Sequence, residues 1–119
     1  MLFQLQGKPI SVNDAFQGKR FKTKDCKQYE SDVFKQMPFR KMIVGDVAVD
    51  FVFYLKGATY AMSDISNLVK ILEDCIVKRG YIEDDRKIIK MSLEKRKSDN
   101  QRVEVYIVAH ETIDYEKIR

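Results

Sequence analysis

Two aspartates and a lysine are the residues of this sequence whose types and spacing best suit chemistry on phosphate. Asp64 opens a predicted helix, and Asp85 follows the turn after that helix. If the strand after Asp85 packs beside the strand before Asp64, the two carboxylates lie on adjacent elements. Carboxylates brought together repel each other unless a cation or a proton lies between them. Hard oxygen ligands suit Mg²⁺ or Mn²⁺, so the spacing indicates a metal site.

Lys70 lies on the polar side of the same helix, four residues after Ser66 and three after Asn67. From there it can reach a phosphate held at the metal and stabilise developing negative charge. Each residue also has an ordinary structural explanation: Asp64 can serve the helix dipole, Asp85 a solvated turn, and Lys70 the surface.

Other kinds of catalytic site find little support. His110 is the only histidine, which argues against a histidine-based triad or a zinc site. The sequence also contains neither GxGxxG nor GxxxxGK[ST], the glycine-rich loops that bind phosphates.

The elements that position these residues follow from hydrophobic periodicity and turn signals. We predict strands over residues 1–7, 42–55, 86–97 and 102–109, helices over 24–37 and 64–79, loops over 8–20 and 56–62, and a hairpin turn at 98–100. Ser63 should cap the second helix and Gly80 should end it. In the strand 86–97, the residues Ile89, Met91 and Leu93 should face inward. The order β-α-β-α-β-β indicates an α+β fold with a small mixed sheet and two helices packed on it, as a single domain over residues 1–119.

Charge is distributed unevenly along the 119 residues. Residues 1–41 hold nine Lys/Arg and four Asp/Glu, whereas the remaining residues hold thirteen and fourteen. A basic N-terminal third beside an acidic centre suggests a polyanionic partner with help from a metal, although a solvated basic surface is the alternative. Cys26 and Cys75 form no CxxC motif, and we find neither a signal peptide nor a membrane-spanning apolar run, so we expect a reduced, cytoplasmic setting.

The segment SDISNLVKILEDCI followed by GYIEDDRKII resembles the RusA family of Holliday-junction resolvases. In this resemblance Asp64, Asn67 and Lys70 match an Asp-x-Asp-Asn-x-x-x-Lys helix start, and Asp84 and Asp85 match a later aspartate pair. The N-terminal KPISVN and GKRFKTKDCKQYESDV also resemble the family's entry segment and the basic segment before its first helix.

The resemblance implies an intertwined homodimer that nicks two opposed strands of a four-way DNA junction and needs Mg²⁺, for which Mn²⁺ can substitute. It implies Asp64, Lys70 and Asp85 as catalytic residues and Asp64, Ser66 and Asp85 as metal ligands. The predicted DNA contacts are Asn13, Lys19, Arg20, Lys22 and Lys24. Such proteins are common in phages and prophages.

One position departs from the family pattern, because Ser66 stands where the family has its second aspartate. A serine hydroxyl brings no charge to a metal, so Glu83 or Asp84 would have to compensate if activity is kept. Three hypotheses follow: a Mg²⁺-dependent junction endonuclease, a junction-binding dimer that is catalytically weak or inactive, and a small interaction domain that binds no nucleic acid.

Overall fold

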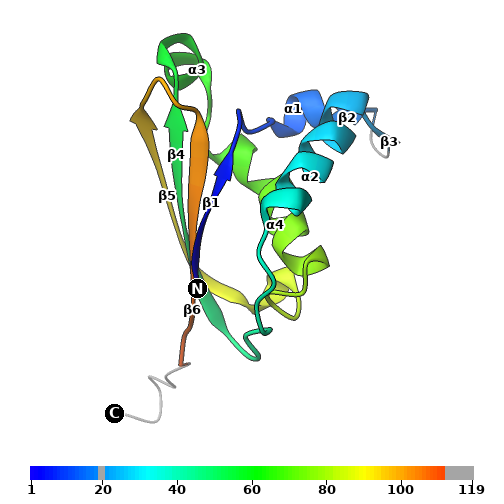
Figure 1. Cartoon of the computed structure of the whole chain (residues 1–119), viewed down its shortest axis with the longest axis vertical. Helices are drawn as coiled ribbons and strands as arrows, with labels where there is room; N and C mark the ends of the chain where they lie inside the picture. The colour runs from blue at the N-terminus through cyan, green and yellow to red at the C-terminus, as the bar shows by residue number, and fades with distance from the viewer. Residues whose placement is uncertain (19–20, 112–119) are drawn as a thin grey trace.

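A four-stranded mixed sheet forms one layer of the structure, and two long helices form the other (Figure 1). The structure is a computed structural model, and it describes residues 1–18 and 21–111. The strands are β1 (Leu2–Gln6), β4 (Val47–Leu55), β5 (Ile88–Lys97) and β6 (Arg102–Ala109), in the spatial order β1-β6-β4-β5. β4 pairs parallel with β5 and antiparallel with β6, and β1 pairs antiparallel with β6. The predicted α+β class and the mixed sheet are therefore confirmed.

Strict alternation along β4 explains why it is an inner strand. Val47, Val49, Phe51, Phe53 and Leu55 are all fully buried on the face that the helices cover. The other face carries Asp50, whose carboxylate accepts a 2.6 Å hydrogen bond from Ser92 Oγ on β5. A period of two thus divides the strand into a core face and an open face.

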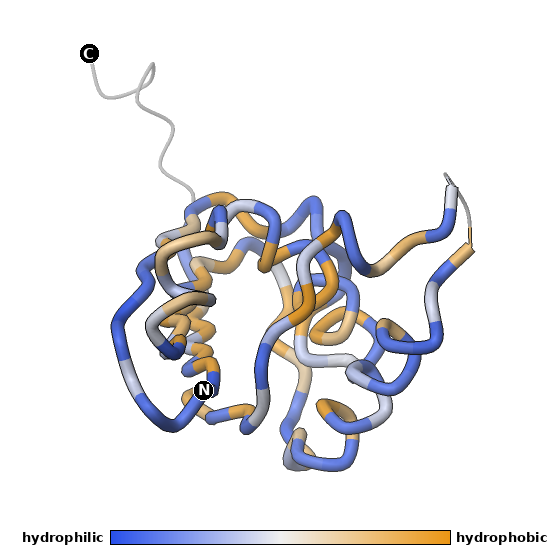
Figure 2. The backbone as a smooth tube through the Cα atoms, turned by 90° about the horizontal axis from the view of Figure 1, so that it is seen from above, coloured by the Kyte–Doolittle hydropathy of each residue, from blue (hydrophilic) through white to orange (hydrophobic). Residues whose placement is uncertain are grey.

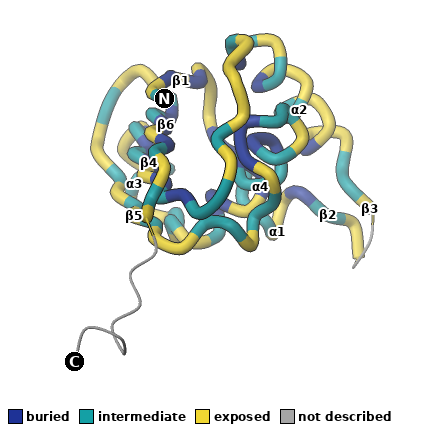
Figure 3. Tube along the Cα trace, turned by 90° about the horizontal axis from the view of Figure 1, so that it is seen from below, coloured by how far each residue is buried: buried dark blue, intermediate teal, exposed yellow. Residues whose placement is uncertain are grey.

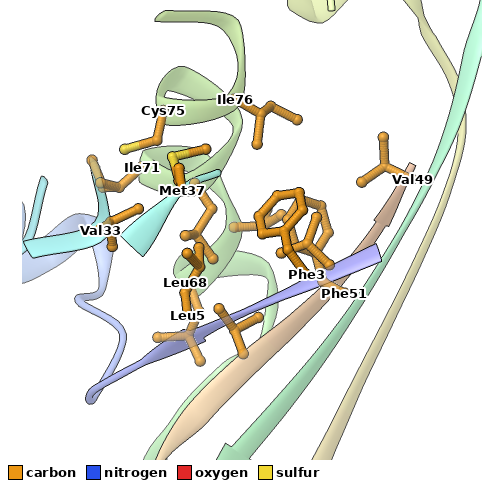
Figure 4. Packing of buried hydrophobic residues seen from close by; sticks show 14 of the residues in the cluster. Phe3, Leu5, Val33, Met37, Val49, Phe51, Leu68, Ile71, Cys75 and Ile76 are labelled. Atoms are coloured by element: carbon orange, nitrogen blue, oxygen red, sulfur yellow. The ribbon is translucent and has the colours of Figure 1, made fainter. Parts of the chain in front are cut away.

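The helices α2 (Lys24–Gln36) and α4 (Ser66–Lys78) cover one face of the sheet (Figure 3). The inward residues of α4 are Leu68, Val69, Ile71, Leu72, Cys75 and Ile76, which interlock with Phe3, Leu5, Val33 and Met37 (Figure 4). Figure 2 shows that hydrophobic residues recur along both the strands and the helices that enclose this core. The opposite face of α4 carries Ser66, Lys70 and Asp74, and so presents polar groups to solvent.

The start of α4 differs from the prediction. Residues 56–62, expected as a loop, form a short helix, α3 (Gly57–Met62), and Ser63 is the C-terminal cap of α3. Helix α4 begins at Ser66 without any side-chain cap, so Asp64 lies between the two helices and not in a first helical turn. The prediction failed because the turn residue Gly57 is tolerated in the first turn of a helix, where backbone N–H groups have no intrahelical partners.

The end of α4 agrees with the prediction. Gly80 has a positive φ of 82°, and its N–H donates to Val77 O at 2.9 Å while Tyr81 N–H donates to Ile76 O at 3.0 Å. These two hydrogen bonds form a Schellman motif, which satisfies the last carbonyls of the helix. The chain then turns into a short 3₁₀ helix, η1 (Asp85–Lys87), directly before β5.

The predicted hairpin at 98–100 is wrong, because β5 and β6 lie on opposite sides of β4. The connection passes over the end of β4, where Ser98 N–H donates to Leu55 O at 2.9 Å. The inward prediction also fails for Ile89, which is 45% exposed. A register shift between Val47 and Ala48 leaves Ile89 without a partner on β4, whereas Met91 and Leu93 pack against the core.

Two predicted boundaries also move. The strand 42–55 begins only at Val47, because Gly45 has a positive φ of 88° and breaks the extended run. The predicted loop 8–20 contains a helical turn, α1 (Val12–Ala15), capped by Ser11, and a small ribbon of β2 (Phe16–Gln17) and β3 (Phe21–Lys22). In Figure 1 this ribbon lies on the helix side of the molecule, far from the sheet. Within the described residues, no helix has the length and apolar character needed to cross a membrane.

Candidate active site and nucleic-acid cleft

Lys70 lies among three carboxylates on the polar face of α4. Its Nζ is 3.5 Å from Asp85 Oδ2, 3.6 Å from Asp74 Oδ1 and 4.0 Å from Glu73 Oε2. Glu73 and Asp74 stand three and four residues further along the helix, which brings them to the same surface strip as Lys70. Asp85 arrives from η1, after the chain has reversed at Gly80. The structure therefore brings two predicted site residues, Lys70 and Asp85, into direct contact.

The charges of this group act on one another. The charge of Asp74, helped by those of Glu73 and Asp85, raises the pKa of Lys70, so the ammonium stays protonated at neutral pH. Burial raises the pKa of Glu73, and the charges of Asp85 and Asp74 add to this rise although Lys70 opposes it. Sequence reasoning did not assign Glu73 or Asp74 to the site, although their spacing from Lys70 is the usual signal for helix ion pairs.

The three acidic residues before β5 have three different partners. Glu83 Oε1 accepts a hydrogen bond from Gly45 N–H at 2.5 Å. Asp84 caps η1 by accepting from Arg86 N–H at 3.0 Å. That backbone hydrogen bond, with a side-chain contact to Asp85 and the Arg86 guanidinium, lowers the pKa of Asp84. Of these three residues, Asp85 is the one whose carboxylate contacts Lys70 on α4.

Asp64 is exposed in the three-residue connection between α3 and α4. Its backbone carbonyl accepts from Asn67 N–H at 3.0 Å, which starts the helical turn. Among the described residues, no contact joins the Asp64 side chain to Lys70 or Asp85. The parallel pairing of β4 and β5 explains this: Asp64 follows the end of β4 and Asp85 precedes the start of β5. The 13-residue α4, about 20 Å long, runs between these two points.

The predicted metal ligands Asp64, Ser66 and Asp85 thus do not form a preformed metal-binding site. In the described ranges 1–18 and 21–111, no three Asp, Glu, His or Cys side chains gather into a group that can hold a metal ion. Ser66 is the exposed first residue of α4 and adds only a neutral hydroxyl. Mg²⁺ commonly takes one or two carboxylates and completes its shell with water and substrate phosphate. Asp64 with Ser66 fits that manner of binding, whereas Asp85 lies at the other end of α4 and does not share a site with them in this structure.

Asp64 and Asn67 face a cleft of about 1170 Å³. One wall comes from α3 and the start of α4, and the other comes from the N-terminal segment and the start of α2. Three of the predicted DNA contacts line it, namely Asn13, Lys22 and Lys24. Lys19 and Arg20 lie outside the described residues. The fold therefore places much of the basic N-terminal segment opposite Asp64, in the connection that precedes α4.

The lysines of this cleft are not equivalent. Lys22 Nζ lies 2.9 Å from Glu30 Oε2, and Lys78 Nζ lies 3.3 Å from the same oxygen. The hydrogen bond that Lys22 donates to Glu30 raises the pKa of Lys22. Burial alone would raise the pKa of Glu30, but the hydrogen bonds that it accepts from Lys22 and Lys78 outweigh burial and lower that pKa. Because Lys22 already neutralises Glu30, the exposed Lys24 offers more of its charge to a polyanion.

Two further lysines of the cleft were not predicted as contacts. Lys27 is one helical turn after Lys24, a spacing that the sequence shows, and Lys8 lies in the segment before α1. Only the folded chain brings Lys8 to the cleft. Acidic side chains line it too: Asp14, Asp25 and Asp64.

The two cysteines are buried free thiols. Burial raises the pKa of Cys75 to about 12 and also raises the pKa of Cys26. Both are therefore protonated at neutral pH and poorly nucleophilic, which is typical of cysteines that serve as core residues.

Comparison with known proteins gives one match. The family model described as Endodeoxyribonuclease RusA matches residues 7–108. This range includes the whole cleft, Lys70 and Asp85. A comparison with curated protein sequences finds no match.

Proposed function

The chain belongs to the RusA endodeoxyribonuclease family, and we propose that it resolves four-way DNA junctions by paired symmetric nicks as a Mg²⁺-dependent homodimer. Membership of this family establishes a nuclease that acts on Holliday junctions. The metal, the dimer and the roles of individual residues are the further content of the proposal.

One observation carries the proposal: residues distant in sequence share a single cleft. Asp64 and Asn67 form part of one wall, and Asn13 and Lys24 form part of the other. Lysine ammonium groups and asparagine side-chain amides commonly contact DNA phosphates, and such contacts position a duplex without reading its sequence. A phosphodiester held in this cleft would therefore lie beside Asp64.

Asp64 would hold the metal, with the Ser66 hydroxyl as a neutral ligand. Asp85, at the other end of α4, would act through its contact with Lys70 and not as a ligand of the same ion. When bound, Mg²⁺ or Mn²⁺ supplies an activated water and neutralises charge on the phosphate. Lys70 would keep a positive charge next to Asp85 and offer it to the non-bridging oxygens as negative charge develops. Asn13 and Lys24 would hold the backbone of the DNA so that the scissile phosphate stays in place.

The alternative proposal is a junction-binding dimer with weak or no catalysis. Two observations favour it: Ser66 supplies no charge, and the described residues form no group of three acidic ligands. Compensation by neighbours would also need rearrangement, because Glu83 bonds to Gly45 and Asp84 caps η1.

The homodimer has support in the open face of the sheet. Leu2 on β1 and Tyr106 on β6 lie opposite each other there and are 63% and 43% exposed. Exposed apolar side chains on an uncovered sheet face are typical of an interface. Two copies related by a two-fold axis would also match the two opposed strands of a four-way junction.

The test is incubation of the protein with a synthetic four-way junction, with and without Mg²⁺, beside the variant Asp85→Asn. We expect paired nicks that need the metal and disappear in the variant, while junction binding persists. Binding without nicks at any metal concentration would support the alternative. Absence of binding at moderate salt would overturn both.

A further inference from the structure

Lys95 on β5 connects the sheet to the segment that carries Asp64. Along β5, Met91, Leu93 and Lys95 alternate on the helix-covered side of the sheet, and Lys95 lies opposite Phe53 of β4. Its Nζ donates a 2.7 Å hydrogen bond to Tyr60 O and a 2.9 Å hydrogen bond to Ser63 O. The same ammonium lies 4.9 Å from the centroid of the Tyr60 ring. One partly buried cation thus holds two carbonyls and one aromatic ring.

Both carbonyls belong to the C-terminal end of α3. The last carbonyls of a helix have no intrahelical partner and carry the negative end of its dipole, so a lysine ammonium is well suited to them. An ammonium offers three donors, and Lys95 uses two of them on this helix end.

Helix α3 has few other anchors. None of its residues is fully buried, and Lys56 at its start makes no side-chain capping hydrogen bond. Tyr60 is the residue of α3 that packs against the core, and it is also the residue that Lys95 contacts. The place of α3 over β5 therefore depends strongly on Lys95.

The held carbonyl of Ser63 directly precedes Asp64. From Asp64 the chain enters α4 through the hydrogen bond from Asn67 N–H to Asp64 O, 3.0 Å long. We propose that Lys95 is a positioning residue that fixes the connection between α3 and α4 and so sets where Asp64 lies on the cleft and where Ser66 begins α4. The effect of Lys95 on catalysis rests on the proposed function, whereas its effect on the position of the connection does not.

The chain offers a matched control in Lys97. It lies two residues further along β5, on the same side of the strand, and its Nζ is 5.3 Å from the centroid of the Tyr60 ring. Among the described residues it donates no hydrogen bond to the connection. Lys95→Met and Lys97→Met remove the same charge from the same region, but only the first removes the two hydrogen bonds to carbonyls.

The first measurement is amide hydrogen exchange on the full chain without DNA or metal. In Lys95→Met we expect exchange over residues 63–68 to accelerate about tenfold or more, while β4 and β6 keep their protection and so report an intact fold. Lys97→Met should exchange like the native protein. Lys95→Arg, whose guanidinium still has donors for both carbonyls, should recover part of the protection that Lys95→Met loses. Equal exchange of the connection in Lys95→Met and Lys97→Met would overturn the proposal.

The second measurement is nicking of a four-way junction at saturating DNA. We expect Lys95→Met to lower the turnover about 10- to 100-fold, because small displacements of a reacting group are costly. Junction affinity should change no more than in Lys97→Met, and Lys95→Arg should regain part of the turnover. Faster exchange with unchanged turnover would overturn the catalytic part. If the native protein nicks no junction, the proposed function fails, and the exchange measurement still decides whether Lys95 positions the connection.

Discussion

The ammonium of Lys70 lies 3.5 Å from the carboxylate of Asp85, and this contact joins the first half of α4 to the turn that leads into β5. The same ammonium also contacts Asp74 and Glu73. A single cation therefore keeps three carboxylates together at the surface. Its loss would leave an uncompensated negative group beside the phosphate that the proposed reaction needs.

Lys70→Met tests this role. We expect nicking to fall about 100-fold, because the developing charge on the phosphate loses the cation proposed to stabilise it. We also expect the pKa of Glu73, already raised by burial, to rise further, because the charge of Lys70 opposes that rise. NMR titration of Glu73 reads this second effect without any DNA. Lys90→Met removes an exposed lysine from β5 and serves as the control; equal losses in both variants would contradict a specific role for Lys70.

Ser66→Asp tests whether position 66 faces the metal. A restored carboxylate should lower the Mg²⁺ concentration for half-maximal nicking about tenfold, because ligand charge tunes the affinity of such sites. An aspartate in the first turn also stabilises a helix by about 0.3–1 kcal/mol, so thermal stability without metal is not the readout. Ser66→Asn, which adds a similar side chain without charge, is the control. An unchanged Mg²⁺ dependence in Ser66→Asp would place residue 66 away from the metal.

Lys24→Ala tests the cleft as the path of the DNA. Loss of one phosphate contact should weaken junction binding and make the slope of log K against log salt less steep by about 0.9. Lys22→Ala should have a smaller effect, because Lys22 is already paired with Glu30 at 2.9 Å. Lys35→Ala removes an exposed lysine from the last turn of α2, away from the cleft, and should leave the slope unchanged. A larger loss of junction affinity in Lys35→Ala than in Lys24→Ala would exclude the cleft as the path of the DNA.

Glu30→Gln tests the ion-pair bridge between β3, α2 and α4. We expect the free energy of unfolding at pH 7 to fall by about 1–2 kcal/mol, because two lysines lose a partly buried partner. The folded-state pKa of Glu30 lies below its ordinary value of 4.5. The stabilisation is therefore present above pH 4.5 and is lost as the pH falls through the lower, folded-state value.

Urea unfolding of both proteins at neutral and acid pH checks this sign. The difference in unfolding free energy between the native protein and Glu30→Gln should shrink at acid pH. Glu94→Gln is the control, because Glu94 is exposed and, within the described residues, its ion pair is with Arg96 on the open face of the sheet. A difference that stays constant across the pH range would show that Glu30 acts through packing and not through its charge.

Local patterns in the sequence were enough to predict several parts of this protein. The alternation of apolar residues from Val47 to Leu55 and the apolar stripe of α4 depend only on residue spacing within a single strand or helix. Both patterns can therefore be recognised before the fold is known. Gly80 is similar, because a helix end requires a residue that tolerates positive φ. The strip of Ser66, Lys70 and Asp74 follows from the same helical period.

Only the tertiary structure decided which strand lies beside which. Residues 98–100 carry the signals of a hairpin turn, but β4 accepts β5 and β6 on its two edges and the turn passes over it. The apolar faces of all three strands satisfy either arrangement, so the period of two does not choose between them. Which strands pair with the two edges of β4 depends on contacts between residues far apart in the sequence, and no local sequence pattern predicts it.

The candidate site divides in the same way. The sequence by itself determined which residue types are present and that Lys70 shares a helix face with Asp74, since both follow from helical spacing. The tertiary structure decided that Asp85, and neither Glu83 nor Asp84, contacts Lys70. It also decided that Asp64 faces the lysines of the cleft at the other end of α4. The physical reason is that parallel pairing of β4 with β5 places the two aspartates at opposite ends of the crossover helix, a relation that depends on strand direction and not on local spacing.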